Sequence, residues 1–381
     1  MSQRTQLEGA NAVRFWAAMS IVMYHVALLP KKELPAFLWV ITNFGGFGVP
    51  LFYVLSAFAL SYGYCGRLET STAIRHFYAR RFFRIAPLFY VMMAVYLVWF
   101  WIRGIGVPSA QVLSNATFTF NLIPGHSESF VPAAWSIGVE MLFYSVFPFI
   151  MIFATNLWRA ALFFAGAVLI AALWAHEFQG ASEQIRPFAT YSLVAHIHYF
   201  AAGILAYFLW RRLRWSGLLH RIVVAGALIG IASLIAFAFP LQLLFFQVLG
   251  DDSRAGMVAV WALVLAMLVL GMSFQHFKRR GLRWTAGLGE ASFSLYLWHP
   301  FIIQALIIFG IYDRIYAFSP QFGYLASVIL TLAILIPASL ASYSLVERRM
   351  GLAAAALLYS KRADFTPGEN NRPLAAKVAA I

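Results

Sequence analysis

Residues 221–240 read RIVVAGALIGIASLIAFAFP, and no charged side chain follows Arg221 in this stretch. A helix needs about 20 mainly apolar residues to cross a bilayer, so this stretch predicts a transmembrane helix. The same kind of stretch recurs along the chain and predicts an all-α, polytopic bundle. We expect ten transmembrane helices, over residues 10–29, 43–64, 86–103, 133–154, 160–177, 191–210, 221–240, 255–275, 290–311 and 322–346.

The composition of the whole chain agrees with a membrane protein. Of the 381 residues, 62% are apolar and only 11% are Asp, Glu, Lys or Arg. Soluble domains carry about 25% charged residues, so this chain lacks the polar side chains to cover a soluble surface. The formal net charge of +14 could indicate nucleic-acid binding. Proteins that bind nucleic acid do not carry ten apolar stretches of this length, however, and we expect no nucleic-acid partner.

The basic residues predict the orientation of the bundle. With the N-terminus in the cytosol, 21 Lys and Arg side chains fall in inner segments and 6 in outer ones, while Arg14 lies within the first helix. The positive-inside rule predicts this bias, so we expect both termini in the cytoplasm and anionic lipids at the inner face. Residues 351–381 are expected to form a short, disordered cytoplasmic tail. The single cysteine, Cys65, excludes an intramolecular disulfide.

Arg14 and His25 are polar residues inside the first predicted helix. Their spacing of 11 residues puts both on one face, about 16 Å apart along the axis. Ionisable groups inside a bilayer are costly and are often functional. The alternative is that Arg14 reaches inner lipid headgroups and that His25 only fills a packing position.

Arg81 and Arg84 lie in a basic, aromatic segment, residues 75–87, before the third predicted helix. Apolar side chains recur there at helical spacing, which predicts an amphipathic helix at the inner membrane surface, capped by Ser71 or Thr72. Residues at i and i+3 point the same way, and two guanidinium forks suit a phosphate or pyrophosphate ligand. Plain binding of lipid headgroups is the alternative.

Glu140 and His299 are the other candidates for proton transfer. Glu140 lies about 12 Å into the fourth helix if that helix begins near Pro132, a depth comparable to that of His25. The alternative role for Glu140 is a structural hydrogen bond, to Tyr144 or to a neighbouring helix. His299 lies near the bilayer midplane, and it could instead only satisfy the carbonyl that Pro300 frees.

We expect no metal site. His196 and His198 lie some 200° apart around a helix and cannot bind one ion together. No Cys, His or carboxylate cluster has metal-ligand spacing.

Five segments, in this order along the chain, resemble the acyltransferase 3 family. They are Asn11–Phe15 with Tyr24 and His25, then Phe52–Phe58, Tyr78–Pro87, Trp135–Glu140 and Ser294–His299. The resemblance covers about residues 7–349 and implies a transmembrane acyltransferase domain over residues 1–350. Members of this family are integral membrane O-acyltransferases that modify cell-surface glycans and related hydroxylated molecules. Asn11-Ala12-Val13 and Ser56-Ala57-Phe58 depart from the usual family pattern.

The resemblance implies that Arg14 with His25, and Arg81 with Arg84, match two signature motifs of the family. It also implies that Trp135, Ser136 and Glu140 are functionally important. Some relatives carry a soluble esterase-like domain after the last helix, and we expect none here. We therefore expect the membrane core to act alone or with a separate partner.

Both lines of reasoning lead to the same expected mechanism. Acyl-CoA, most simply acetyl-CoA, would enter from the cytosol as donor substrate, with no bound cofactor. Arg81 and Arg84 would hold its phosphates, and Arg14 the polar chain behind them. His25 would act as general base, supported by Glu140, with His299 as a further proton carrier and Tyr144 as a supporting residue. A covalent route through Ser56 or Ser294 stays open.

The expected acceptor is a surface polysaccharide, a lipid-linked glycan or a small hydroxylated molecule outside a bacterial cytoplasmic membrane. The alternative is a proton-coupled exporter or a lipid or glycan flippase, in which His and Glu relay protons. Such transporters are expected to show inverted repeats and broken helix pairs, and no such symmetry is visible in this sequence. A third possibility, the other large class of membrane O-acyltransferases, disagrees with the two arginine motifs.

Overall fold

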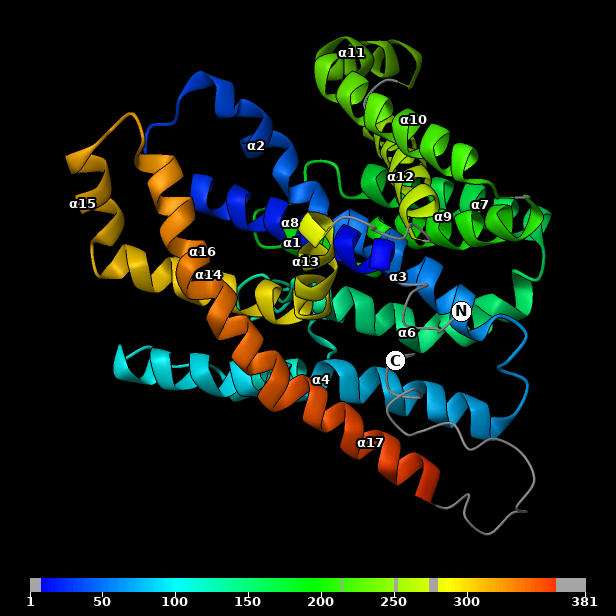
Figure 1. Cartoon of the computed structure of the whole chain (residues 1–381), viewed down its shortest axis with the longest axis horizontal. Coiled ribbons are helices and arrows are strands. Elements are labelled where there is room, and N and C mark those ends of the chain that lie inside the picture. The colour runs from blue at the N-terminus through cyan, green and yellow to red at the C-terminus, as the bar shows by residue number, and fades with distance from the viewer. Residues whose placement is uncertain (1–7, 214, 250–252, 274–279, 361–381) are drawn as a thin grey trace.

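The computed structural model describes residues 8–213, 215–249, 253–273 and 280–360, and the regular elements in these ranges are all helices (Figure 1). One π-helical turn, Tyr343–Glu347, joins the last two helices. The α-helices are α1 Glu8–Leu28, α2 Trp39–Phe44, α3 Gly48–Tyr64, α4 Ser71–Ile102, α5 Ser109–Ala116, α6 Trp135–Phe153, α7 Leu157–Glu177, α8 Arg186–Thr190, α9 Leu193–Arg212, α10 Gly217–Ala236, α11 Ala238–Leu249, α12 Ser253–Met272, α13 Arg280–Glu290, α14 Ser292–Ile308, α15 Ile311–Phe318, α16 Gly323–Ser342 and α17 Arg348–Ser360.

Each of the ten predicted segments falls on a helix, and the chain is a multi-pass membrane protein by its apolar helices. Within the described ranges, seven helices are long and apolar enough to cross a membrane, and an eighth crossing is formed if the bent pair α13–α14 counts as one span. That pair bends by 73° at Ala291. The number of ten spans and the cytosolic termini stay predictions.

Two predicted features differ from the structure. The arginine segment before Pro87 is not a separate surface helix, because α4 runs unbroken for 32 residues with Pro87 inside it. Its N-cap is Thr70, whose side chain accepts from the backbone N–H of Ala73, rather than Ser71 or Thr72. The last helix, α17, continues to Ser360, so the predicted tail begins in a helix, and residues 361–381 lie outside the described ranges.

Glycines let the central helices approach one another closely. A Cβ at Gly48 of α3 would stand 2.3 Å from the carbonyl oxygen of Ala17 in α1. A Cβ at Gly203 of α9 would stand 2.2 Å from the carbonyl oxygen of Val54 in α3. Small residues at such contacts allow the close van der Waals packing that holds helices together in membranes. Together they fix α3 between α1 and α9.

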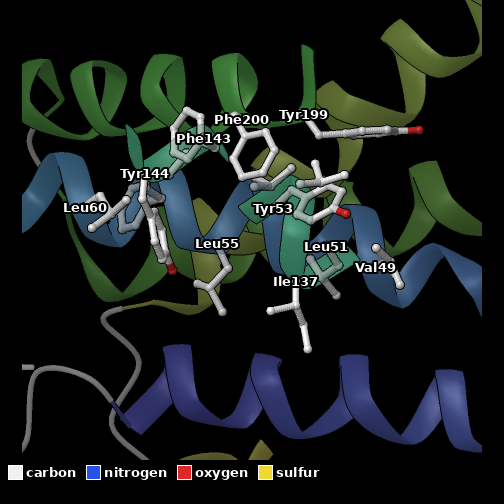
Figure 2. Packing of buried hydrophobic residues seen from close by; sticks show 14 of the residues in the cluster. Val49, Leu51, Tyr53, Leu55, Leu60, Ile137, Phe143, Tyr144, Tyr199 and Phe200 are labelled. Atoms are coloured by element: carbon white, nitrogen blue, oxygen red, sulfur yellow. The ribbon is translucent and has the colours of Figure 1, made fainter. Parts of the chain in front are cut away.

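Aromatic side chains fill the space between α3, α6 and α9, as Figure 2 shows. The rings of Phe143 and Phe200 stack with centroids 3.9 Å apart, and Tyr53 stacks on Phe200 at 4.5 Å. Leu55 and Ile137 point toward α1. Leu55 and Ile137 therefore form part of the surface that faces α1.

Side-chain contacts bring separate loops together at two ends of the bundle. At one end, Nη1 of Arg211 lies 3.6 Å from Sγ of Cys65, which joins the end of α9 to the α3–α4 loop. At the other end, Lys32 and Asp313 form an ion pair between the loop after α1 and α15. The predicted spans place Cys65 and Arg211 on one side of the membrane. They place Lys32 and Asp313 on the other side. In the structure each of these two pairs is in contact, as the prediction requires.

Candidate active site

Two histidines from distant parts of the chain meet between α1 and α14. Nε2 of His299 lies 3.0 Å from Nδ1 of His25, and the ring centroids are 4.9 Å apart. His299 is fully buried, whereas His25 is partly accessible. The structure thus joins two residues that the sequence singled out independently.

Contacts with neighbouring carbonyl groups indicate which ring nitrogen of each histidine carries the hydrogen. Nδ1 of His299 lies 2.5 Å from the carbonyl oxygen of Tyr296, and Nδ1 of His25 lies 3.1 Å from that of Ile21. A carbonyl oxygen only accepts hydrogen bonds, so each Nδ1 carries the hydrogen when the ring is neutral. Nε2 of His299 then accepts from Nδ1–H of His25. This leaves Nε2 of His25 with a lone pair, which a general base requires.

Tyr296, one turn before His299, ties the histidine pair to α6. Its hydroxyl donates to the carbonyl oxygen of Ala133 at 2.7 Å, and Oγ of Ser136 lies 2.7 Å from the same hydroxyl. Oγ of Ser136 donates to the same carbonyl oxygen at 3.3 Å, so Tyr296, Ser136 and Ala133 form one hydrogen-bonded group. Ala133 itself has a φ of +64°, a left-handed backbone that costs a non-glycine residue about 1 kcal/mol or more. The bond from Tyr296 helps to hold this conformation.

Trp135, the first residue of α6, stacks on two rings near the start of α9. Its ring centroid is 4.5 Å from that of Tyr191 and 5.4 Å from that of His196. Ser136 and Trp135 therefore hold the start of α6 against α14 and α9. Both were predicted as supporting residues, and this placement explains how they could act.

Three arginines gather at the other end of the same face of α1. Arg14 lies within electrostatic range of Arg81 and Arg84 from α4, and its Nη1 donates to Oδ1 of Asn11 at 2.8 Å. The guanidinium of Arg81 is buried, 5.7 Å from the ring centroid of Tyr64 and 5.8 Å from that of Tyr144. Cation–π contacts of this kind stabilise a desolvated guanidinium.

Glu140 belongs to this arginine end. Its Oε1 accepts from Oγ of Ser56 at 2.7 Å and from the hydroxyl of Tyr144, and its charge lies within range of Arg14. The sequence favoured a role for Glu140 in supporting His25. In the structure Glu140 instead makes the structural hydrogen bond to Tyr144, and His299 is the residue that contacts Nδ1 of His25.

Glu347 is a candidate residue that sequence reasoning missed. It ends the π-helical turn, accepts a hydrogen bond from Oγ of Ser294, and lies within electrostatic range of Arg84. In the sequence it stands at the end of a predicted span beside Arg348, where an acid is typical of the headgroup region. One feature of the sequence could have identified Glu347. The predicted spans place it at the same end of the bundle as Arg81 and Arg84.

The balance of charge at the arginine end favours an anion. Three guanidinium groups, of Arg14, Arg81 and Arg84, share the region with two carboxyl groups, of Glu140 and Glu347. Positive charge is in excess even with both acids ionised. Arginine forks fit phosphate oxygens, so these residues suit a phosphorylated donor. About 16 Å of α1 separates this end from His25.

Known proteins are similar to this chain over most of its length. An acyltransferase domain of the acyltransferase 3 family matches residues 7–340. A peptidoglycan O-acetyltransferase of Listeria monocytogenes is 24% identical over 79% of this chain and 50% of its own length. The chain thus spans half the length of that relative.

Two further relatives match along most of their own length. A putative acetyltransferase of Acidianus two-tailed virus is 24% identical over 78% of this chain and 84% of its own. An acyltransferase of Streptomyces mycarofaciens is 24% identical over 78% of this chain and 79% of its own length. No solved structure matches this chain. The match of the family over residues 7–340, together with the arginine cluster and the histidine pair, shows that the chain belongs to the acyltransferase 3 family.

Proposed function

We propose that the protein is a membrane-bound O-acyltransferase that moves an acyl group, most simply acetyl, from cytosolic acyl-CoA to a hydroxyl of an extracytoplasmic glycan. The observation that carries this proposal is the arrangement along α1. An anion-binding cluster lies at one end of its inward face, and a histidine with a free lone pair lies at the other. A donor with a phosphorylated head and a long thioester arm fits that arrangement.

In the proposed reaction His25 moves the proton. Its Nε2 takes the hydrogen of the acceptor hydroxyl as the hydroxyl oxygen attacks the thioester carbonyl carbon. The carbon–sulfur bond breaks, CoA leaves as the thiolate, and the proton on His25 passes to that sulfur. The products are an ester and free CoA, and His25 returns to its neutral form. His299 keeps the hydrogen of His25 on Nδ1 throughout.

Direct transfer is the simpler route for this geometry. Ser56 donates to Glu140 and Ser294 donates to Glu347. In the described part of the chain, no hydrogen bond joins either serine to a histidine, which a serine nucleophile activated by a base would need. Both serines instead lie at the arginine end, where the donor is proposed to bind. The carboxylates that they contact, of Glu140 and Glu347, partly balance the charge of the arginines there.

The name of one relative supports a glycan acceptor. The Listeria relative is a peptidoglycan O-acetyltransferase. The proposal places the arginine end of this protein in the cytosol and the histidine end toward the outside of a bacterial cytoplasmic membrane. The excess of basic side chains in the predicted inner loops supports that orientation.

Transfer of labelled acetyl groups tests the function. Membranes with the protein, with its Arg81→Ala variant, or without it are given acetyl-CoA labelled in the acetyl group, together with the cell's own envelope glycans. The proposal expects alkali-labile label on glycan with the wild-type protein and little with Arg81→Ala. Glycan transport across the membrane without any acylation would instead support the exporter or flippase.

A further inference from the structure

A basic cavity opens beside the arginine cluster, where the end of α3 meets the beginning of α4. Its volume is about 350 Å³, within the range of sites that hold small ligands. None of the residues that line it is acidic, and its polar and aromatic wall is made by Tyr64, Arg67, Thr70, Thr72, His76 and Arg80. None of these except Tyr64 belongs to the site described above.

Tyr64 joins this cavity to the arginine cluster. Its ring lines the cavity, and its hydroxyl accepts from Nη2 of Arg81 at 3.5 Å. A ligand in the cavity would therefore lie next to Arg81 and could continue toward Arg14 and Arg84. The cavity is an extension of the proposed donor site at its loop end.

The chemistry of the wall indicates what the cavity binds. Arg67 and Arg80 supply guanidinium forks, and His76 adds a further donor. Thr70 and Thr72 place the positive end of the long helix α4 at the same wall. The Tyr64 ring offers a flat apolar surface against which a base can stack. The side chains of the wall therefore suit a ligand that carries both a phosphate and an aromatic base.

We infer that this cavity binds the 3′-phosphorylated adenosine end of acyl-CoA, an inference that rests on the proposed function. A lipid headgroup shares the phosphate but has no aromatic base. The recessed wall formed by Tyr64 and the α4 end suits the nucleotide. Arg67 and Arg80 act in donor binding and lie outside the reacting end of the substrate.

Donors of different length test this inference. The Arg67→Ala, Arg80→Ala double variant should raise KM for acetyl-CoA about tenfold or more, because each arginine–phosphate contact is charge-assisted. kcat should not change. KM for S-acetylpantetheine, which lacks the nucleotide, should be the same in variant and wild type. Arg75→Ala is the matched control, since Arg75 is exposed on α4 and does not line the cavity.

A binding measurement separates this inference from the proposed function. Adenosine 3′,5′-bisphosphate should raise the melting temperature of the purified wild-type protein and of Arg75→Ala, but not of the double variant. This result needs no acyl transfer, so it can hold even where the proposed reaction fails. Arg67→Ala alone, a change at an exposed loop residue, should show part of the loss without a risk to folding.

Three results would overturn the inference. One is an equal rise in KM for acetyl-CoA and S-acetylpantetheine. Another is an unchanged KM for both donors in the double variant. The third is stabilisation by nanodiscs of anionic phosphatidylglycerol with none by the nucleotide, which would assign the cavity to a lipid headgroup.

Discussion

Nδ1–H of His25 faces two acceptors, the carbonyl oxygen of Ile21 and Nε2 of His299. Ile21 belongs to the same helix and holds the ring from one side only. His299 comes from α14, and its own Nδ1 is held by Tyr296. The orientation of the proposed base therefore depends on a second helix.

His299→Ala tests this dependence. Loss of the acceptor leaves the His25 ring less well oriented, and small misplacements of a reacting group can reduce rates by up to about 10²-fold. We expect a lower kcat and an unchanged KM for acetyl-CoA, because the arginines lie at the other end of α1. His176→Ala, at an exposed position of α7, is the matched histidine control. A normal kcat in His299→Ala would limit His299 to a packing role.

Substitution of Arg81 tests whether the arginine end binds the donor. Its guanidinium lies 5.7 Å from the ring centroid of Tyr64 and 5.8 Å from that of Tyr144, and in the proposed function it holds a phosphate of the donor. Arg81→Ala and Arg84→Ala should each raise KM for acetyl-CoA about tenfold or more, the range expected for a charged hydrogen bond. Arg81→Lys should recover only part of the loss, since an ammonium makes no forked contact.

The measurement for the donor end is a set of initial rates over a range of acetyl-CoA concentrations in membranes that contain equal amounts of each variant. Full activity of an Arg81→Ala, Arg84→Ala double variant would reduce these residues to lipid anchors.

The sequence predicted which polar residues lie inside the bundle better than it predicted their partners. The charges of Arg14, Arg81 and Arg84 and the depth of His25 follow from residue type and from position along a helix. The partner of Glu140 depends on how α6 is rotated about its axis, and depth carries no information about that rotation. Glu140 consequently turns to Ser56 and Tyr144, and Glu347 was missed because its partner Ser294 lies 53 positions away.

At the scale of elements, apolar runs predicted the helices well and their ends less well. Each predicted span falls on a helix because about 20 apolar residues in lipid must satisfy their own backbone groups. The beginning of α4 was predicted as a separate surface helix because its arginines are typical of an interface. The structure instead continues the helix from Ser71 to Ile102, since Thr70 caps it and Pro87 does not break it.

Close contact between α1 and α3 is a property of elements that substitution can test. Gly48→Val would place side-chain atoms where the Ala17 carbonyl oxygen now lies, with even a Cβ only 2.3 Å away. Overpacking of this kind costs about 1–3 kcal/mol, and it would move α1, which carries both Arg14 and His25. We expect a lower melting temperature in detergent and a loss of transferase activity.

Gly166→Ala is the control for this change, because nothing lies within 4 Å of a Cβ at that position of α7. It should leave activity unchanged and stability equal or slightly higher, as alanine favours a helix. A Gly48→Val protein with normal stability and activity would show that the close approach of α1 and α3 is not required.

At the scale of the whole molecule, the proposed reaction requires the arginine end to face the cytosol. Reporter fusions after Gly66 and Thr155, in the loops at the arginine end, should report the cytosol. Fusions after Gly104, Gly125 and Gly180 should report the outside. All five positions lie in turns between helices rather than within them. One reversed reporter would contradict the count of basic residues that predicts the orientation.

In the proposed reaction, His25 is the base that activates the acceptor hydroxyl. The most direct measurement compares the acyl-transfer rate of His25→Gln with that of the wild type, at saturating acetyl-CoA, alongside binding of acetyl-CoA to both. Glutamine keeps the size of the side chain but cannot take up the proton. We expect a loss of about 10²–10⁴-fold in rate, the range for general base catalysis, with donor binding intact about 16 Å away along α1. A His25→Gln protein that transfers acyl groups at the wild-type rate would contradict this proposal.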